Sequence, residues 1–205
     1  MIKVNYQKEL DRIVAGLDPA KPAPRVLLHS CCGPCSSYVL EYLTQYFSVT
    51  VFFYNPNIQP EEEYHKRLAC QKDLIAALPA KHPITLIECG WDGEAFVEAA
   101  RGQEGAPEGG SRCSACFDLR LSKTAALARE QGFDYFCTTL TVSPHKDAQR
   151  LNQLGYALGE QWGVNWLPGD FKKREGYKRS IQLSAEYDLY RQNYCGCLYS
   201  KPAEE

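Results

Sequence analysis

The sequence lacks any uninterrupted apolar run of the roughly 18 residues that a membrane-spanning helix needs. Its first segment, MIKVNYQKELDRIV, is charged and amphipathic, which does not fit a signal peptide. The chain also lacks a strong net charge: at −2, with a pI near 6.1, it has no global nucleic-acid-binding signature. We therefore expect a cytoplasmic protein without a membrane partner, in a compartment where thiols stay reduced.

The chain also has no internal repeat and no Ser/Gly-rich linker. A length of 205 residues suits one domain, and an apolar content of 44% is ordinary for a globular protein. We therefore predict a single domain over residues 1–205. An N-terminal helix and lead-in would cover 1–24, and a basic helical C-terminal extension would cover 168–205. From Gly169 to Lys201, seven Lys or Arg stand against four Asp or Glu, so a locally basic surface could attract a polyanion.

Apolar stretches of strand length alternate with stretches of helical spacing. We expect strands at 25–29, 49–54, 84–88, 133–139 and 164–167. We expect helices at 37–47, 60–78, 94–100, 113–131, 147–162 and 177–190. This alternation is typical of an α/β fold with a Rossmann-like parallel sheet. In such sheets the binding site lies at the carboxyl ends of the strands, where most of the chemically active side chains of this sequence are expected.

What the chain does have is ten cysteines, seven of them in three tight groups. The groups are Cys31-Cys32-Gly-Pro-Cys35, Cys113-Ser-Ala-Cys116 and Cys195-Gly-Cys197. In a reducing compartment, thiols this close in sequence indicate a metal centre or redox chemistry more often than structural disulfides. The other three, Cys70, Cys89 and Cys137, are expected to be small buried apolar residues.

The first two groups together offer enough thiolates for one metal centre. Cys31, Cys32, Cys113 and Cys116 would supply four ligands, which suits a [4Fe–4S] cluster or zinc. Cys35 is a fifth candidate, and spacing alone does not choose among the five. Vicinal cysteines are unusual in structural zinc sites, so the pattern favours iron–sulfur over zinc and over a redox dithiol without a cluster.

The third group differs in kind. A disulfide between Cys195 and Cys197 would close a small, strained ring, and strained disulfides are easily reduced. Such a pair suits electron relay better than structural support. The alternatives are two further metal ligands or a pair that stays reduced.

Several polar residues are candidates for the same site. Asp92 follows the third expected strand and could be a metal ligand, a proton donor or a turn former. Ser143 is expected to cap a helix whose first turn contains His145 and Lys146, which would make a phosphate site or an ordinary capped helix. His29 is expected to be a packed core histidine.

The segment VLLHSCCGPCSSYVLEYL resembles the start of a pyrophosphate-loop ATPase, an adenine-nucleotide alpha-hydrolase-like fold, with cysteines in place of the loop glycines. ATP binding is therefore not expected. Taken with the later motifs, the chain resembles the cobalamin-independent epoxyqueuosine reductase family, QueH, over about residues 25–200. The motifs are His29–Cys35, Tyr54–Ile58, Glu108–Cys116 with Arg120 and Leu121, Thr138–Lys146, Asp170–Lys173 and Tyr190–Cys197.

The resemblance implies an oxidoreductase that acts on a tRNA. Epoxyqueuosine at the wobble position of the anticodon would be reduced to queuosine, with two electrons and two protons consumed and water released. The resemblance assigns a [4Fe–4S] cluster to Cys31, Cys32, Cys113 and Cys116, with Cys35 outside the ligand set. It assigns a redox-active disulfide to Cys195 and Cys197.

The expected cofactors are the cluster and an additional mononuclear iron held in part by Asp92, without cobalamin. The expected partners are the tRNA, through its anticodon loop, and an external electron donor, with substrate contacts from Lys146, His145 and Asn55. Three other functions fit parts of the sequence: an ATP-using iron–sulfur tRNA thiolase, a zinc-stabilised RNA-binding module, and a thiol–disulfide oxidoreductase that uses Cys32 and Cys35.

Overall fold

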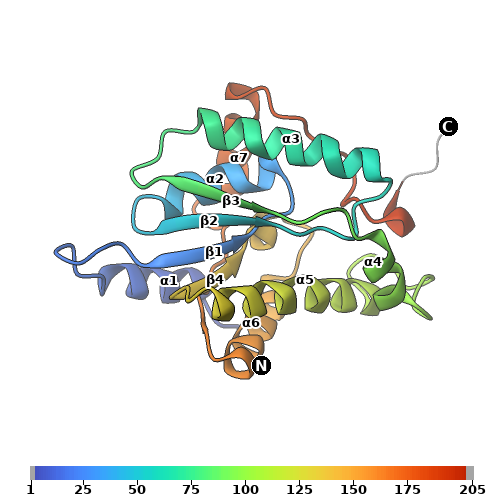
Figure 1. Ribbon diagram of the computed structural model, residues 1–205, viewed down its shortest axis with the longest axis horizontal. Coiled ribbons are helices and arrows are strands. Elements are labelled where there is room, and N and C mark those ends of the chain that lie inside the picture. The colour runs from blue at the N-terminus through green and yellow to red at the C-terminus, as the bar shows by residue number, and fades with distance from the viewer. Residues whose placement is uncertain (1–2, 202–205) are drawn as a thin grey trace.

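The computed structural model describes residues 3–201 and is built on a five-stranded parallel sheet (Figure 1). The strands are β1 (Arg25–His29), β2 (Ser48–Phe53), β3 (Ile84–Glu88), β4 (Tyr135–Thr138) and β5 (Asn165–Trp166). Their order across the sheet is β3-β2-β1-β4-β5, and every neighbouring pair is parallel. The expected α/β class with a parallel sheet is therefore confirmed.

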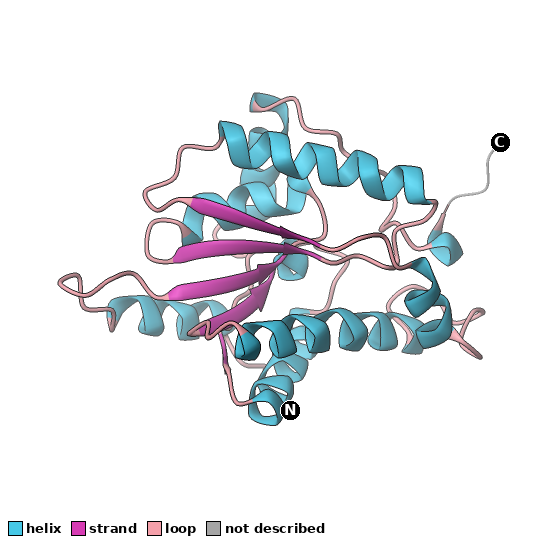
Figure 2. Ribbon diagram, viewed as in Figure 1, coloured by secondary structure: helices cyan, strands magenta, loops and turns pink. Residues whose placement is uncertain are grey.

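Helices cover both faces of the sheet (Figure 2). They are α1 (Tyr6–Ala15), α2 (Gly33–Leu43), α3 (Glu61–Ala77), α4 (Gly93–Ala100), α5 (Ser111–Glu130), α6 (Ala148–Trp162) and α7 (Gly176–Glu186). In Figure 1, α2, α3 and α7 lie above the sheet, and α1, α5 and α6 lie below it. Among residues 3–201, no helix has the length and apolar content to cross a membrane.

The central strands are largely apolar because helices cover them on both sides, although β1 starts at the exposed Arg25 and β2 at Ser48. In β1, Val26, Leu27 and Leu28 are fully buried, and the strand ends in His29, which is buried as well. The edge strand β3 is only partly buried. Core packing thus fixes the central strands, and the chain leaves the sheet at their carboxyl ends with polar and sulfur-bearing residues.

Most helix boundaries differ from the prediction by one or two residues, but α2 is shifted by four and α7 ends at Glu186 rather than at residue 190. Two of the differences lie next to cysteines or charged site residues. Helix α2 begins at Gly33 rather than at residue 37, because Pro34 suits a first helical turn and Cys32 is the N-cap. Helix α6 is capped by Asp147, whose side chain accepts hydrogen bonds from the backbone N–H groups of residues 149 and 150. Ser143 is therefore not the cap, and His145 and Lys146 lie in a turn before the helix.

The close packing of α6 on β5 predicts a large effect for a small substitution. A methyl group on Gly155 would collide with the ring of Trp166, which is 5% exposed. We expect Gly155→Ala to lower the free energy of unfolding by about 1–3 kcal/mol, as overpacked cores do. Gly105→Ala is the matched control, since nothing lies within 4 Å of its added methyl group. Denaturant unfolding of both variants checks this, and equal stability would contradict the packing described.

Candidate metal and redox site

A cavity of about 390 Å³ opens at the carboxyl ends of the strands, where the sequence predicted the site. Its walls come from the turn between β1 and α2, the start of α5, the turn before α6 and the segment 191–197. Six of the seven clustered cysteines line it: Cys31, Cys35, Cys113, Cys116, Cys195 and Cys197. Tertiary structure therefore brings the three cysteine groups to one place.

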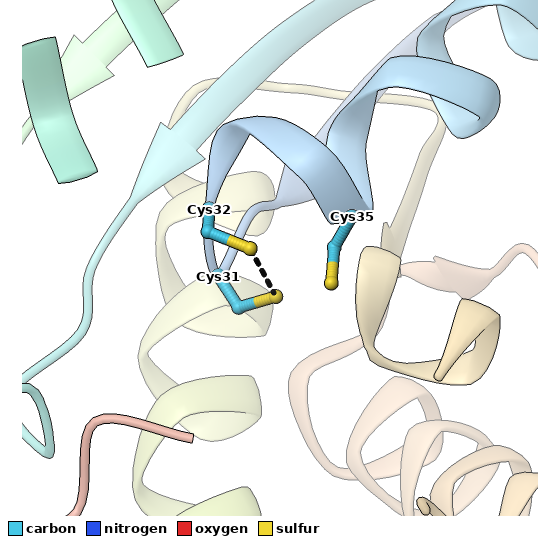
Figure 3. A group of neighbouring side chains, drawn as sticks. All are labelled: Cys31, Cys32 and Cys35. Carbon is cyan, nitrogen blue, oxygen red and sulfur yellow. Dashed lines mark hydrogen bonds between the residues drawn. The ribbon is translucent and has the colours of Figure 1, made fainter. Parts of the chain in front are cut away.

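Cys31, Cys32 and Cys35 form a compact group of thiols at the junction of β1 and α2. Their sulfur atoms all lie within 4.8 Å of one another, and Figure 3 shows them pointing toward a common centre. The Sγ atoms of Cys31 and Cys32 are 3.8 Å apart. The turn needs Gly33, because a Cβ there would lie 2.8 Å from the sulfur of Cys70. This group could hold a metal ion.

These three thiols share one negative charge. Hydrogen bonds from Cys32 and Cys35 lower the pKa of Cys31 well below its usual value. The bond with Cys31 raises the pKa of Cys32 to about 12, and it raises the pKa of Cys35 as well. The thiolate form is therefore favoured at Cys31, and a bound metal would draw protons from the others because thiolate is the ligating form.

Cys113 and Cys116 lie on the first turns of α5 and are both 8% exposed. Both face the cavity, as their spacing of three residues predicted. The backbone N–H of Gly109 donates to the sulfur of Cys113 at 3.2 Å, and Arg120 Nη1 lies 3.8 Å from the sulfur of Cys116. Their sulfurs are not part of the compact group formed by Cys31, Cys32 and Cys35. They line the same cavity as Cys31 and Cys35.

Among the described residues, two buried arginines line the cavity without a carboxylate partner within 4.0 Å. Arg112 is 2% exposed and Arg120 is 3% exposed, and both line the cavity. In the described part of the chain, neither has an acidic side chain within 4.0 Å. A buried charge without a counter-charge is costly. The negative charge that the cavity can offer is that of its thiolates and of Glu108.

Arg120 is held by residues at the ends of two neighbouring strands. Its Nη2 donates to Asn55 Oδ1 at 2.6 Å, and its Nε donates to His29 Nε2 at 3.2 Å. Burial, with the charge of Arg120, lowers the pKa of His29 to about 3. The histidine is therefore neutral. With Nε2 accepting from Arg120, the ring carries its proton on Nδ1, which donates to Thr138 Oγ1 at 2.8 Å, so Nε2 does not donate to the Tyr54 carbonyl 3.2 Å away. His29 is a packed core residue, as expected, and it also orients the arginine.

Cys195 and Cys197 lie on the segment that follows α7 and are hydrogen-bonded to each other. Gly196 between them has φ +99°, a backbone conformation that L side chains rarely adopt. The bond from Cys197 and the charge of Lys146, acting against burial, lower the pKa of Cys195 to about 5. The same bond raises the pKa of Cys197. Cys195 is therefore the more nucleophilic member of the pair.

The turn before α6 brings a cation to the cavity mouth. Lys146 pairs with Glu108 at 2.9 Å, and its side chain is 11% exposed. His145 lines the same wall. Among the described residues that line the cavity, Glu108 is the one carboxylate, whereas Arg67 and Arg191 add positive charge. The mouth therefore suits an anionic ligand.

Asn55 and Asp92 lie away from the cavity wall. Asn55 is 1% exposed, donates to the carbonyl of Ser30 at 2.8 Å and accepts from Arg120. Here it supports Arg120, and contact with a substrate would require one of these bonds to break. Asp92 is exposed at the start of α4, where its carboxylate accepts a 3.4 Å hydrogen bond from Tyr54. Its metal or acid role stays a prediction.

Sequence reasoning gave no role to two residues that touch the site. Arg120 belonged to a recognised motif, but nothing local showed that it would be buried without a carboxylate. Gln192 Nε2 donates to the sulfur of Cys32 at 3.0 Å across 160 residues of sequence. Long-range contacts of this kind have no signal in a single sequence.

The sequence of the chain matches a known protein family. The model of the family "Epoxyqueuosine reductase QueH" matches residues 26–203. The chain belongs to the QueH family of epoxyqueuosine reductases. Among its relatives, QueH of Streptococcus pyogenes is 44% identical over 97% of this chain and 78% of that protein. QueH of Staphylococcus epidermidis is 42% identical over 97% and 85%, and QueH of Thermotoga maritima is 34% identical over 85% and 89%.

One solved structure shares the fold. The U34-tRNA thiolase NcsA from Methanococcus maripaludis, with its [4Fe-4S] cluster, superposes with a TM-score of 0.55. The superposition covers 95% of this chain and 67% of that chain, at 15% sequence identity. At this identity the likeness concerns the fold alone. It agrees with the expected relation of this QueH-family chain to pyrophosphate-loop proteins.

Proposed function

We propose that this QueH-family reductase converts epoxyqueuosine to queuosine at the wobble position of a tRNA anticodon. The observation that carries the proposal is the cavity that gathers six cysteines from three parts of the chain and is also lined by two buried arginines with no carboxylate of the described residues within 4.0 Å. Thiols alone would suit many centres. Thiols that lie beside buried cations in need of a counter-charge suit an anionic iron–sulfur cluster.

Cys31, Cys32, Cys113 and Cys116 would hold a [4Fe–4S] cluster, with Cys35 beside it. When bound, the cluster would supply electrons and Lewis acidity toward the epoxide oxygen. We also propose a mononuclear iron held in part by Asp92, no requirement for cobalamin, an external electron donor and a cytoplasmic location. Asp92 does not line the cavity, so the proposal of a mononuclear iron has to be tested by a direct count of the bound metal.

The residues of the chain have their own part in the reaction. Oxidation of the Cys195 and Cys197 thiols to a disulfide releases two electrons and two protons. Loss of the epoxide oxygen as water consumes the same number, so one dithiol balances one turnover. Lys146, with His145 and Arg191, would bind anticodon phosphates, and unpaired anticodon-loop bases can be splayed out into such a cavity.

The positive charge of Arg120 is expected to affect the reduction potential of the proposed cluster. We expect Arg120→Met to shift the cluster to a more negative reduction potential, because removing a buried cation destabilises the more negative, reduced form. A loss of about 1.4 kcal/mol corresponds to roughly 60 mV for a one-electron couple. The measurement is a redox titration followed by electron paramagnetic resonance. Arg129→Met, on the exposed end of the same helix, is the matched control and should leave the potential unchanged.

Anaerobic purification, with iron, zinc and sulfide analysis and then an assay on tRNA that carries epoxyqueuosine, tests the proposal. We expect about four irons and four sulfides per chain, a brown absorption band that bleaches on reduction, and formation of queuosine. Iron beyond four would support the mononuclear site. One zinc without colour after reconstitution would instead support an RNA-binding module, and ATP-dependent thiolation of the tRNA would support a thiolase.

A further inference from the structure

The segment that carries Cys195 and Cys197 has no helix or strand between the end of α7 and Leu198. A ladder of backbone hydrogen bonds therefore does not fix it. Its position depends on side chains that reach it from elsewhere. Those side chains come from α3, and backbone groups of the turn before α3 add hydrogen bonds.

The main contact is a buried ion pair on α3. The side chain of Arg67 is 1% exposed, and its Nε donates to Glu63 Oε1 at 2.7 Å. The same guanidinium donates from Nη2 to the carbonyl of Tyr194 at 3.5 Å and lies 5.0 Å from the centre of the Tyr194 ring. Glu63 in turn accepts from the hydroxyl of Tyr190, 3.2 Å from each carboxylate oxygen. The pair thus holds both tyrosines that precede Cys195.

A second set of bonds joins the same segment to the turn before α3. The backbone N–H of Gln59 donates to the carbonyl of Gly196 at 2.9 Å, and the Tyr194 hydroxyl donates to the carbonyl of Gln59 at 3.0 Å. A Cβ on Gly196 would lie 3.0 Å from Arg67 Nη1. The guanidinium therefore lies directly against the glycine between the two cysteines.

We propose that Arg67, held by Glu63, is a positioning residue that fixes the Cys195-Gly196-Cys197 loop against the cavity wall. An arginine can donate in two fixed directions at once, here to Glu63 and to the loop, whereas lysine offers a single ammonium group. Formation of the Cys195–Cys197 disulfide joins their two sulfurs and releases the two protons and two electrons that epoxide reduction consumes. The redox use of the pair rests on the proposed function, but the positioning of the loop does not.

The test measures how fast each thiol of the metal-loaded protein reacts with iodoacetamide under native conditions, by mass spectrometry. Cys197 is 5% exposed, so its reaction reports on opening of the loop. We expect Arg67→Met to raise its rate on the order of tenfold, with no restoration in Arg67→Lys. Tyr190→Phe, which removes one hydroxyl from Glu63, should give a smaller rise and serves if Arg67→Met fails to fold.

Two controls separate loop positioning from general loss of structure. Glu61→Gln removes the exposed pair between Glu61 and His65 on the same helix and should leave the Cys197 rate unchanged. Cys137, 1% exposed in β4, reports on global opening within each variant. An unchanged Cys197 rate in folded Arg67→Met, or equal rises at Cys197 and Cys137, would overturn the proposal.

The rate of epoxyqueuosine reduction is measured separately from the reactivity of the thiols. In Arg67→Met we expect kcat for tRNA reduction to fall while KM for the tRNA and the iron content stay at parent values. If the parent protein reduces no epoxyqueuosine but the Cys197 rate responds as described, the proposed function fails and the positioning role stands. If the parent is active and kcat does not change in Arg67→Met, the positioning role in the reaction fails.

Discussion

Replacing Cys113 with serine is expected to leave less than about one iron per chain, where the parent holds about four. Cys113 is 8% exposed on the cavity wall, and a serine hydroxyl is a poor ligand for iron in a sulfur-ligated cluster. Reduction of epoxyqueuosine in the tRNA should disappear with the cluster, because no centre near the substrate would then pass electrons to the epoxide. Iron and sulfide analysis after anaerobic reconstitution, together with the visible spectrum, makes the measurement.

The matched control for this substitution is Cys89→Ser. Cys89 is half-buried after β3 and is not among the residues that line the cavity, so its variant should keep its iron. Cys35→Ser should also keep its iron under the ligand assignment we propose, although its sulfur lies with those of Cys31 and Cys32. Parent levels of iron and sulfide in Cys113→Ser would contradict that assignment, and loss of iron in Cys35→Ser would place Cys35 in the ligand set.

Replacing Cys195 with serine is expected to abolish activity as well, but to leave the iron content at the parent level. Cys195 carries the lowered pKa of the pair, and no disulfide can form without it. The experiment is a single turnover by pre-reduced enzyme without added reductant. We expect the yield of queuosine to fall by at least about 100-fold, because the two thiols act together and removing one removes the function of both. Liquid chromatography of the digested tRNA measures the product.

The partner cysteine gives a stricter form of the same experiment. If the two thiols act together, Cys197→Ser should lose as much activity as Cys195→Ser, and the double variant should lose no more than either. Cys89→Ser is again the control with one cysteine removed outside the cavity. Parent activity in Cys195→Ser would show that the pair supplies no electrons to this reaction.

Much of the fold could be predicted because burial leaves a clear pattern in the sequence. The strands at Arg25–His29 and Ile84–Glu88 have the predicted bounds, since an apolar run between turn residues has one stable placement in a covered sheet. Helix starts were less accurate. The helix predicted from residue 37 begins at Gly33, and the cap predicted at Ser143 is at Asp147, because several residues at each site can cap or begin a helix.

The sequence by itself determined the parallel α/β class, the family and the three cysteine groups, because periodicity, motifs and spacing are local properties of a chain. Only the tertiary structure decided that these groups share one cavity, that Arg112 and Arg120 are buried there without carboxylates, and that Arg67 lies against Gly196. The residues concerned lie more than 75 positions apart in the sequence: Cys31 and Cys113 line one cavity, and Arg67 lies against Gly196. Whether a charge finds its partner depends on how separate elements pack, which no local pattern records.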